Sequence, residues 1–247
     1  MRTLKHCALG LMAKAPLAGA VKTRLVPPLT HEEAAELNRC FLRDMATSIS
    51  EITVRQAVTG FVVYTPLGAE AMFREMLPAG FNLLGQQGES LGDRLCNATR
   101  DLLALGFDSL CLINSDSPTL PQSVIDSAVA ALLPEGDRIV IGGAADGGYY
   151  LIGLKQVHPK LFERIAWSTD KVLIQTLERA DTLGLEIELL RPWYDVDDAL
   201  TLEQLCEELF LAGPQNGNYA APYTRRYLAQ LIESGRIFPK FAGRTTS

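Results

Sequence analysis

CALGLMAKAPLAGAVKTRL, residues 7–25, is the stretch around which the rest of the chain is organised. It begins with an apolar run, residues 7–12, short enough to be a strand buried on both faces. The run breaks into a loop that contains Gly19 and the cations Lys14, Lys22 and Arg24. Backbone N–H groups and cations at the carboxyl end of a buried strand are suited to hold phosphates. The stretch therefore predicts an anion site; the alternative is a solvated loop whose cations pair with nearby carboxylates.

The loop matches neither of the two glycine motifs that identify nucleotide sites directly. GAVKTRL, residues 19–25, lacks the GxxxxGK[ST] spacing of a P-loop, and no GxGxxG follows the strand. The missing GxGxxG disfavours a dinucleotide-dependent dehydrogenase. Other segments must therefore decide what the anion site binds.

The composition indicates a globular protein without a broad basic surface. With 247 residues, of which 47% are hydrophobic, the chain can bury a large core as one α/β domain, the alternative being two small ones. A net charge of -6 argues against a nucleic-acid partner or an anionic membrane surface, because both need a basic face. We find no apolar run as long as a membrane span and no signal-peptide core. We expect a soluble cytoplasmic protein, and the sequence does not indicate its oligomeric state.

The cysteines and histidines do not suggest a metal site. The five cysteines are scattered without a CxxC pair, and two of them, Cys7 and Cys111, lie in apolar runs. The three histidines, His6, His31 and His158, have no metal-ligand spacing. We interpret the cysteines as reduced thiols that serve as small core residues.

Strand and helix patterns alternate along the chain. Thr30 and Glu33 form a capping box that begins a helix to about residue 50. Further strands are expected at 57–64, 83–84, 110–113, 138–144 and 186–190, with helices at 69–77, 95–105, 124–133 and 168–183 and around Leu205 and Tyr227. This rhythm predicts a three-layer α/β/α fold with a mostly parallel sheet. We expect one domain over residues 1–213, with a helical appendage over 214–247 packed on it.

Acidic residues follow several of the expected strands. Asp116, Asp146 and the pair Asp195 and Asp197 stand where strands end, and these ends face one crevice in a doubly wound sheet. Carboxylates there can hold Mg²⁺ or Mn²⁺, which bridges phosphate oxygens. We predict that Asp116 binds the metal, because a carboxylate at the end of a buried strand is costly without a partner. The alternatives are a turn or helix-capping aspartate at each position.

The segment DGGYY, residues 146–150, and the later WST, residues 167–169, are candidates for binding an acceptor. Asp146 could orient an acceptor hydroxyl, take its proton or help to bind metal, and the glycines allow a close backbone approach. The competing interpretations are a tight turn, a helix cap at Ser168 or Thr169, and buried aromatic rings, Trp193 included. We assign to acceptor binding the residues Gly147, Gly148, Tyr149, Trp167, Ser168 and Thr169.

Taken together, the segments resemble a known family over about residues 4–205. The matching segments are KAPLAGAVKTRL (14–25), LGDRL (91–95), SDSPTLP (115–121), DGGYYLIGL (146–154), WSTDKVLIQT (167–176) and DVDDALTLEQL (195–205). They resemble the glycosyltransferase-A-like family of radical-SAM/selenodomain-associated transferases, relatives of the molybdenum-cofactor and phospholactate guanylyltransferases. The resemblance implies a nucleotide-diphospho-sugar transferase fold with a central mixed sheet.

The resemblance also implies roles for single residues. The residues implied for nucleotide binding are Ala13, Lys14, Gly19, Lys22, Arg24, Gly88, Gly92, Asp93 and Arg94. Asp116 would bind metal with Asp195 or Asp197. We assign catalytic roles to Lys22, Asp116 and Asp146. This sequence departs from the family pattern at Asn114, where glycine is common, at Gly143, where proline is frequent, and at Asp198, where threonine is frequent.

The implied reaction is the transfer of a group from a nucleotide donor to a small-molecule acceptor. The family resemblance favours glycosyl transfer from a nucleotide-sugar. The residues lean toward nucleotidyl transfer, because SDS carries one aspartate rather than a DxD pair and a lysine-arginine loop suits a triphosphate. A nucleotide-binding module without catalysis is a third hypothesis.

Overall fold

The computed structural model describes residues 5–212 and 217–245. In these ranges seven strands form one sheet in the order β3-β2-β1-β4-β6-β5-β7. The strands are β1 (Cys7–Lys14), β2 (Val58–Thr65), β3 (Asn82–Gly85), β4 (Ser109–Ile113), β5 (Arg138–Ala144), β6 (Tyr149–Leu154) and β7 (Glu186–Trp193). All neighbours pair in parallel except β6, which runs antiparallel to both β4 and β5. The predicted α/β fold with a mostly parallel, mixed sheet is confirmed.

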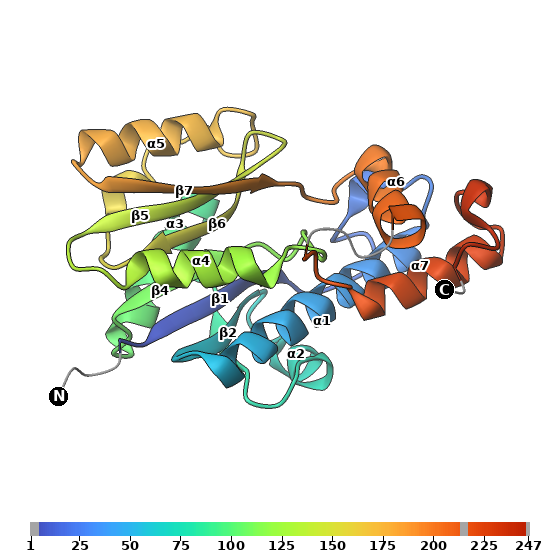
Figure 1. Cartoon of the computed structure of the whole chain (residues 1–247), viewed down its shortest axis with the longest axis horizontal. Helices are drawn as coiled ribbons and strands as arrows, with labels where there is room; N and C mark the ends of the chain where they lie inside the picture. Colours follow the sequence, from blue (N-terminus) through green and yellow to red (C-terminus); the bar gives the residue numbers. More distant parts are fainter. Residues whose placement is uncertain (1–4, 213–216, 246–247) are drawn as a thin grey trace.

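Helices cover both faces of the sheet, as Figure 1 shows. They are α1 (His31–Arg55), α2 (Glu70–Met76), α3 (Leu91–Ala104), α4 (Gln122–Leu132), α5 (Val172–Thr182), α6 (Ala199–Glu207) and α7 (Pro222–Glu233). Side chains of α1, α2 and α4 share one buried cluster with the sheet, and side chains of α3 and α5 share another on the opposite face. The three-layer arrangement follows from these two cores.

The strand β1 lies at the centre of the sheet and is buried over most of its length. It pairs in parallel with β2 on one side and with β4 on the other, and only its last residue, Lys14, is exposed. A strand with neighbours on both edges and helices on both faces must be apolar throughout, which explains the run CALGLMA. The loop that follows β1 therefore starts from a fixed point.

The helix α1 begins at the predicted capping box. The Thr30 hydroxyl accepts from Glu33 N at 3.2 Å, and the Glu33 carboxylate accepts from Thr30 N at 2.8 Å. The apolar residues that recur at helical spacing along it are buried: Ala34, Leu37, Phe41, Met45 and Ile49. The helix ends at Arg55, about five residues later than predicted, because Ile52 continues the apolar face into the core.

Two local predictions need correction. The segment 149–154, which the sequence analysis did not assign as a strand, is β6, and it follows β5 through a tight turn. The helix α5 has Lys171 as its N-cap, without a side-chain hydrogen bond, rather than Ser168 or Thr169. The Thr169 hydroxyl instead donates to Ala166 O at 2.7 Å, so it stabilises the turn before the helix.

A third buried cluster joins the C-terminal helices to the start of the chain. Leu25, which follows the basic loop, packs with Leu37 and Phe41 of α1, with Leu205 of α6 and with Leu228 of α7. The expected boundary between residues 213 and 214 lies outside the described residues, so the division into a domain and an appendage stays a prediction. No described helix is long and apolar enough to cross a membrane.

Asp44 ties α7 to α1. This side chain is fully buried, and its carboxylate accepts from Tyr223 N at 3.0 Å and from Thr224 N at 2.8 Å. These N–H groups belong to the first turn of α7, which has no partner for them within the helix. Burial raises the pKa of Asp44 to about 6, although the hydrogen bonds oppose the shift.

This raised pKa predicts a pH dependence of stability. The folded protein holds a proton on Asp44 more tightly than the unfolded chain, so the contribution is present at low pH and is lost as pH rises through about 6. We expect the free energy of unfolding of the wild type, relative to Asp44→Asn, to fall by about 2 kcal/mol between pH 4.5 and pH 7.5. Urea denaturation at both pH values measures it. Asp181→Asn, at an exposed position on α5, is the control. The prediction is contradicted if the difference in the free energy of unfolding between wild type and Asp44→Asn is the same at both pH values.

Candidate functional site

A cavity opens at the carboxyl end of β1, β2 and β4. Its volume is about 370 Å³. It is lined by Met12, Ala13, Lys14, Ala20, Val21, Lys22, Thr23, Arg24, Asn38, Thr65, Gln86, Leu91, Arg94, Ser115, Asp116 and Asp197. Five residues predicted to bind nucleotide, Ala13, Lys14, Lys22, Arg24 and Arg94, are in this lining, as are two of the three predicted metal ligands.

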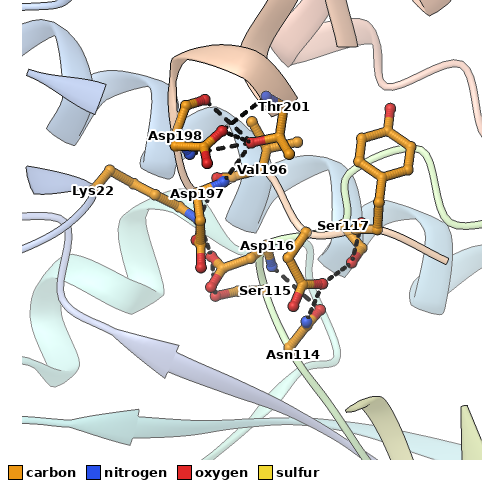
Figure 2. A network of polar contacts seen from close by, with 11 residues as sticks. Lys22, Asn114, Ser115, Asp116, Ser117, Val196, Asp197, Asp198 and Thr201 are labelled. Carbon is orange, nitrogen blue, oxygen red and sulfur yellow. Dashed lines mark hydrogen bonds and ion pairs between the residues drawn. The ribbon is translucent and has the colours of Figure 1, made fainter. Parts of the chain in front are cut away.

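The ammonium of Lys22 lies between two of the aspartates. Its Nζ is 2.7 Å from Asp116 Oδ1 and 2.9 Å from Asp197 Oδ1, and it donates to Val196 O at 2.8 Å. Figure 2 shows the side chain reaching from its loop to both carboxylates. The Lys22 side chain is only 5% exposed. Burial alone would lower the pKa of Lys22, but the charges of Asp116 and Asp197 raise it above its ordinary value.

Asp195 is held separately from this ion pair. Its Oδ1 accepts from Asn114 Nδ2 at 2.6 Å and from the Ser117 hydroxyl at 2.7 Å. Burial, followed by the nearby charge of Asp116, raises the pKa of Asp195 to about 6. Asn114, a departure from the family pattern, thus has a defined partner. The sequence left Asp195 and Asp197 open as the second metal ligand, and the structure places Asp197 beside Asp116 on the cavity.

Backbone contacts set the position of the two cavity aspartates. Val196 N donates to Asp116 O at 2.9 Å, which joins the segment after β4 to the segment after β7. Asp198 then caps α6, since its carboxylate accepts from Thr201 N at 2.9 Å. With its neighbours fixed on both sides, Asp197 is presented to the cavity.

Three further cations surround the cavity. Lys14 Nζ donates to Ala20 O at 2.7 Å, and Arg94 Nε donates to Gly88 O at 3.1 Å. Within residues 5–212 and 217–245, no carboxylate forms an ion pair with Lys14, Arg24 or Arg94. The predicted alternative, a loop whose cations pair with carboxylates, therefore describes Lys22 but not these three. Cations that have no ion-pair partner around a concave surface attract phosphate groups.

The other residues predicted for nucleotide binding shape the loops beside the cavity rather than line it. Gly88 has φ +119°, and a Cβ there would lie 2.4 Å from Asp93 Cβ. Asp93 forms a capping box with Ser90, which lowers the pKa of Asp93. Gly92 packs closely on Trp167, and Gly19 has φ +74° in the basic loop. Each has a structural reason for its residue type, and their roles toward a nucleotide stay predictions.

The residues predicted for acceptor binding, and Asp146, do not line this cavity. The Asp146 carboxylate accepts from Gly148 N at 2.8 Å, which closes the turn between β5 and β6. Gly147 has φ +87°, and its carbonyl accepts from Leu173 N at 2.8 Å at the start of α5. Tyr149 and Trp167 contact each other edge to face with ring centroids 6.5 Å apart. Their functional roles remain predictions.

Among the lining residues that the sequence analysis did not predict are two with buried or bridging amide side chains, Asn38 and Gln86. Asn38 lies on the buried face of α1 and is 4% exposed, and its Oδ1 has no hydrogen-bond partner among the described residues. A polar residue among the apolar positions of an amphipathic helix was the available signal. Gln86 Nε2 donates to Val63 O at 2.7 Å and to Ala13 O at 3.3 Å, which joins the ends of β1 and β2. Nothing in the sequence distinguished Gln86 from a surface loop residue.

The carboxylates beside Lys22 resemble a magnesium site in residue type. Among the described residues, no group of three or more His, Cys, Asp or Glu side chains is placed to hold an ion. Mg²⁺ usually keeps several waters and takes one or two carboxylates together with substrate phosphates. Asp116 and Asp197 are two carboxylates close enough for one Lys22 ammonium to contact both. They therefore fit a magnesium ion that also binds substrate phosphates.

Comparison with known proteins supports the fold. Residues 48–169 match the family described as an uncharacterized protein conserved in bacteria (DUF2064). The chain is 27% identical, with a TM-score of 0.79, to a protein of Desulfovibrio desulfuricans G20 provisionally assigned as a nucleotide-diphospho-sugar transferase. That match covers 93% of this chain and 98% of the other. The membership in the radical-SAM-associated subfamily stays a prediction.

More distant structures share the fold alone. A cytidylyltransferase from Leptospira borgpetersenii is 12% identical over 98% of each chain, with a TM-score of 0.51. The 4-diphosphocytidyl-2C-methyl-D-erythritol synthase of Anaerococcus prevotii is 8% identical, covers 81% of this chain and 96% of its own, and has a TM-score of 0.53. No curated protein sequence matches the chain.

The contacts of Gly147 can be tested against a matched glycine. Gly147→Ala adds a Cβ 2.3 Å from Asp170 O at φ +87°, whereas Gly184→Ala at φ +68° meets open space. In both variants the free energy of unfolding falls by about 1 kcal/mol, because alanine is strained in a left-handed backbone conformation. The backbone clash should bring the Gly147→Ala loss to about 2–4 kcal/mol. Urea denaturation measures both, and equal losses would mean that Gly147 does not dock α5 as described.

Proposed function

We propose that the protein is a metal-dependent transferase whose donor is a nucleotide or a nucleotide-sugar. The observation that carries this proposal is the convergence of unpaired cations and an aspartate pair on one cavity. Lys14, Arg24 and Arg94 supply positive charge, and Asp116 and Asp197 supply hard oxygen ligands. A diphosphate or triphosphate with a divalent cation needs both kinds of group at once.

The donor phosphates would lie along the loop after β1. Arg24 is exposed on this loop, and Lys14 and Arg94 approach the cavity from β1 and α3. The unpartnered Oδ1 of Asn38 offers an acceptor to a hydroxyl or N–H group of the ligand. These residues bind and orient the donor, and the cations stabilise negative charge as it develops on the leaving phosphate.

Asp116 and Asp197 would hold Mg²⁺ or Mn²⁺. When bound, the ion supplies Lewis-acid stabilisation of the phosphate oxygens. Asp195, fixed by Asn114 and Ser117, adds negative charge behind Asp116 and so favours a cation at this end of the cavity.

Glycosyl transfer is the first candidate reaction, supported by the name of the Desulfovibrio protein, the more similar of the structures compared. An acceptor hydroxyl oxygen would form a bond to the anomeric carbon of the sugar. The bond from that carbon to the diphosphate oxygen would break, the hydroxyl proton would pass to a base or water, and a nucleoside diphosphate would leave. The acceptor would be a small molecule.

Nucleotidyl transfer is the second candidate, favoured by the number of unpaired cations beside the cavity. An oxygen of an acceptor phosphate would attack the α-phosphorus of a nucleoside triphosphate. The bond from that phosphorus to the bridging oxygen would break, and pyrophosphate would leave with the charge that Lys14, Arg24 and Arg94 can balance.

A ligand screen tests nucleotide binding and separates the two reactions. Nucleoside triphosphates, nucleoside diphosphates and nucleotide-sugars are each added with and without Mg²⁺ or Mn²⁺, and thermal unfolding is followed. A ligand at one hundred times its Kd stabilises by about 2.7 kcal/mol. Arg24→Gln should weaken the best ligand about fivefold, whereas Arg74→Gln, exposed on α2, should not. A protein that none of these ligands stabilises would contradict the proposal.

Catalysis is tested at Asp116. We expect Asp116→Asn to lower turnover by about 10³-fold or more, because a metal ligand is lost, while the protein stays folded. Asp181→Asn on α5 should keep wild-type turnover. Release of pyrophosphate or nucleoside diphosphate is the readout, and circular dichroism checks the fold. Wild-type rates in Asp116→Asn would refute the metal role, and metal-dependent nucleotide binding without turnover in the wild type would favour a binding module.

A further inference from the structure

The ammonium of Lys22 has no hydrogen-bonding capacity left for a phosphate. An ammonium carries three N–H donors, and Lys22 has three acceptors in Asp116 Oδ1, Asp197 Oδ1 and Val196 O. All three lie within 2.7–2.9 Å of Nζ. In this arrangement Lys22 neutralises carboxylates, and it can meet a phosphate only by giving up a partner.

The acceptors that hold Lys22 are those that a divalent cation prefers. Mg²⁺ and Mn²⁺ bind carboxylate and carbonyl oxygens, and two oxygens of this set belong to Asp116 and Asp197. The Lys22 ammonium, whose side chain is only 5% exposed, repels a second cation at this position. A divalent ion that takes Oδ1 of both carboxylates therefore competes with the ammonium for the same two atoms.

The backbone of Lys22 shows that this arrangement is held by its surroundings. Lys22 has φ 48° and ψ 37°, a left-handed conformation that is uncommon for a residue with a side chain. Leu25, three residues later, is fully buried in the cluster formed with α1, α6 and α7. The loop is thus anchored while the long side chain of Lys22 retains several rotatable bonds with which to change partners.

We propose that Lys22 is a resident counter-ion that excludes divalent cations from Asp116 and Asp197 until donor phosphates draw its ammonium away. The coupling to phosphates rests on the proposed function; the exclusion of cations does not. Phosphate oxygens replace the carboxylates as acceptors for Lys22, and the vacated carboxylates accept the metal. Metal and nucleotide then bind with positive cooperativity, because each stabilises the same position of Lys22.

The test measures Mn²⁺ binding in the absence of nucleotide, by electron paramagnetic resonance of the free ion. Lys22→Met removes the competing charge, and we expect it to bind Mn²⁺ at least about tenfold more tightly than the wild type. Lys22→Met/Asp116→Asn should lose that gain. Lys14→Met is the matched control, because it removes the same charge from the same cavity but Lys14 donates to Ala20 O and not to a carboxylate.

Equal Mn²⁺ affinity in the wild type and Lys22→Met would overturn the inference, as would the same gain in Lys14→Met. If Lys22→Met does not fold by circular dichroism, Lys22→Gln keeps a polar end in the buried position and answers the same question. If nucleotide stabilises the wild type but the wild type and Lys22→Met bind Mn²⁺ equally, the inference about Lys22 is refuted and the proposed function stands. Tighter Mn²⁺ binding by Lys22→Met in a protein that no nucleotide stabilises would refute the proposed function and support the exclusion of cations.

Discussion

The contact between the Lys22 ammonium and the carboxylates of Asp116 and Asp197 is the interaction on which the site depends. The hydrogen bond from Val196 N to Asp116 O joins the segments after β4 and β7, and these segments carry three aspartates. Carboxylates that lie this close together repel one another unless a cation lies among them. The basic loop after β1 supplies that cation. The same contact therefore holds the loops together at this edge of the sheet and balances the charge of the cavity.

Much of the fold was predictable because local and tertiary preferences agree. The capping box at Thr30, the apolar run of β1 and the limits of β5 at Arg138–Ala144 all appear in the structure as expected. The strand β6 was not, since its direction depends on the turn at Asp146 and on pairing with β4, which is distant in sequence. The start of α5 was also misplaced, because Thr169 competes for backbone groups in the preceding turn.

The sequence predicted which charged residues lie at the candidate site but not which of them contact one another. The ends of strands identified Asp116 and Asp197, and the loop composition identified Lys22 and Arg24. That Lys22 contacts carboxylates rather than faces an open phosphate site depends on the path of its side chain, which sequence patterns do not encode. Asn38 escaped notice because a single polar residue on a buried helix face carries no specific chemical signature. The roles predicted for residues 146–149 and 167–169 await functional tests.

The sequence separation of the Lys22 contacts bears on how the protein matures during its synthesis. Lys22 is 174 residues from its carbonyl partner, Val196. At a synthesis rate of about 5–20 residues per second, the ribosome needs roughly 10–35 s to make the intervening chain. Throughout that interval β1 and its loop exist without the segment that completes their charge balance. The nascent chain is therefore incapable of forming this site until residues 196 and 197 have emerged, and by then the last strand, β7, has been made.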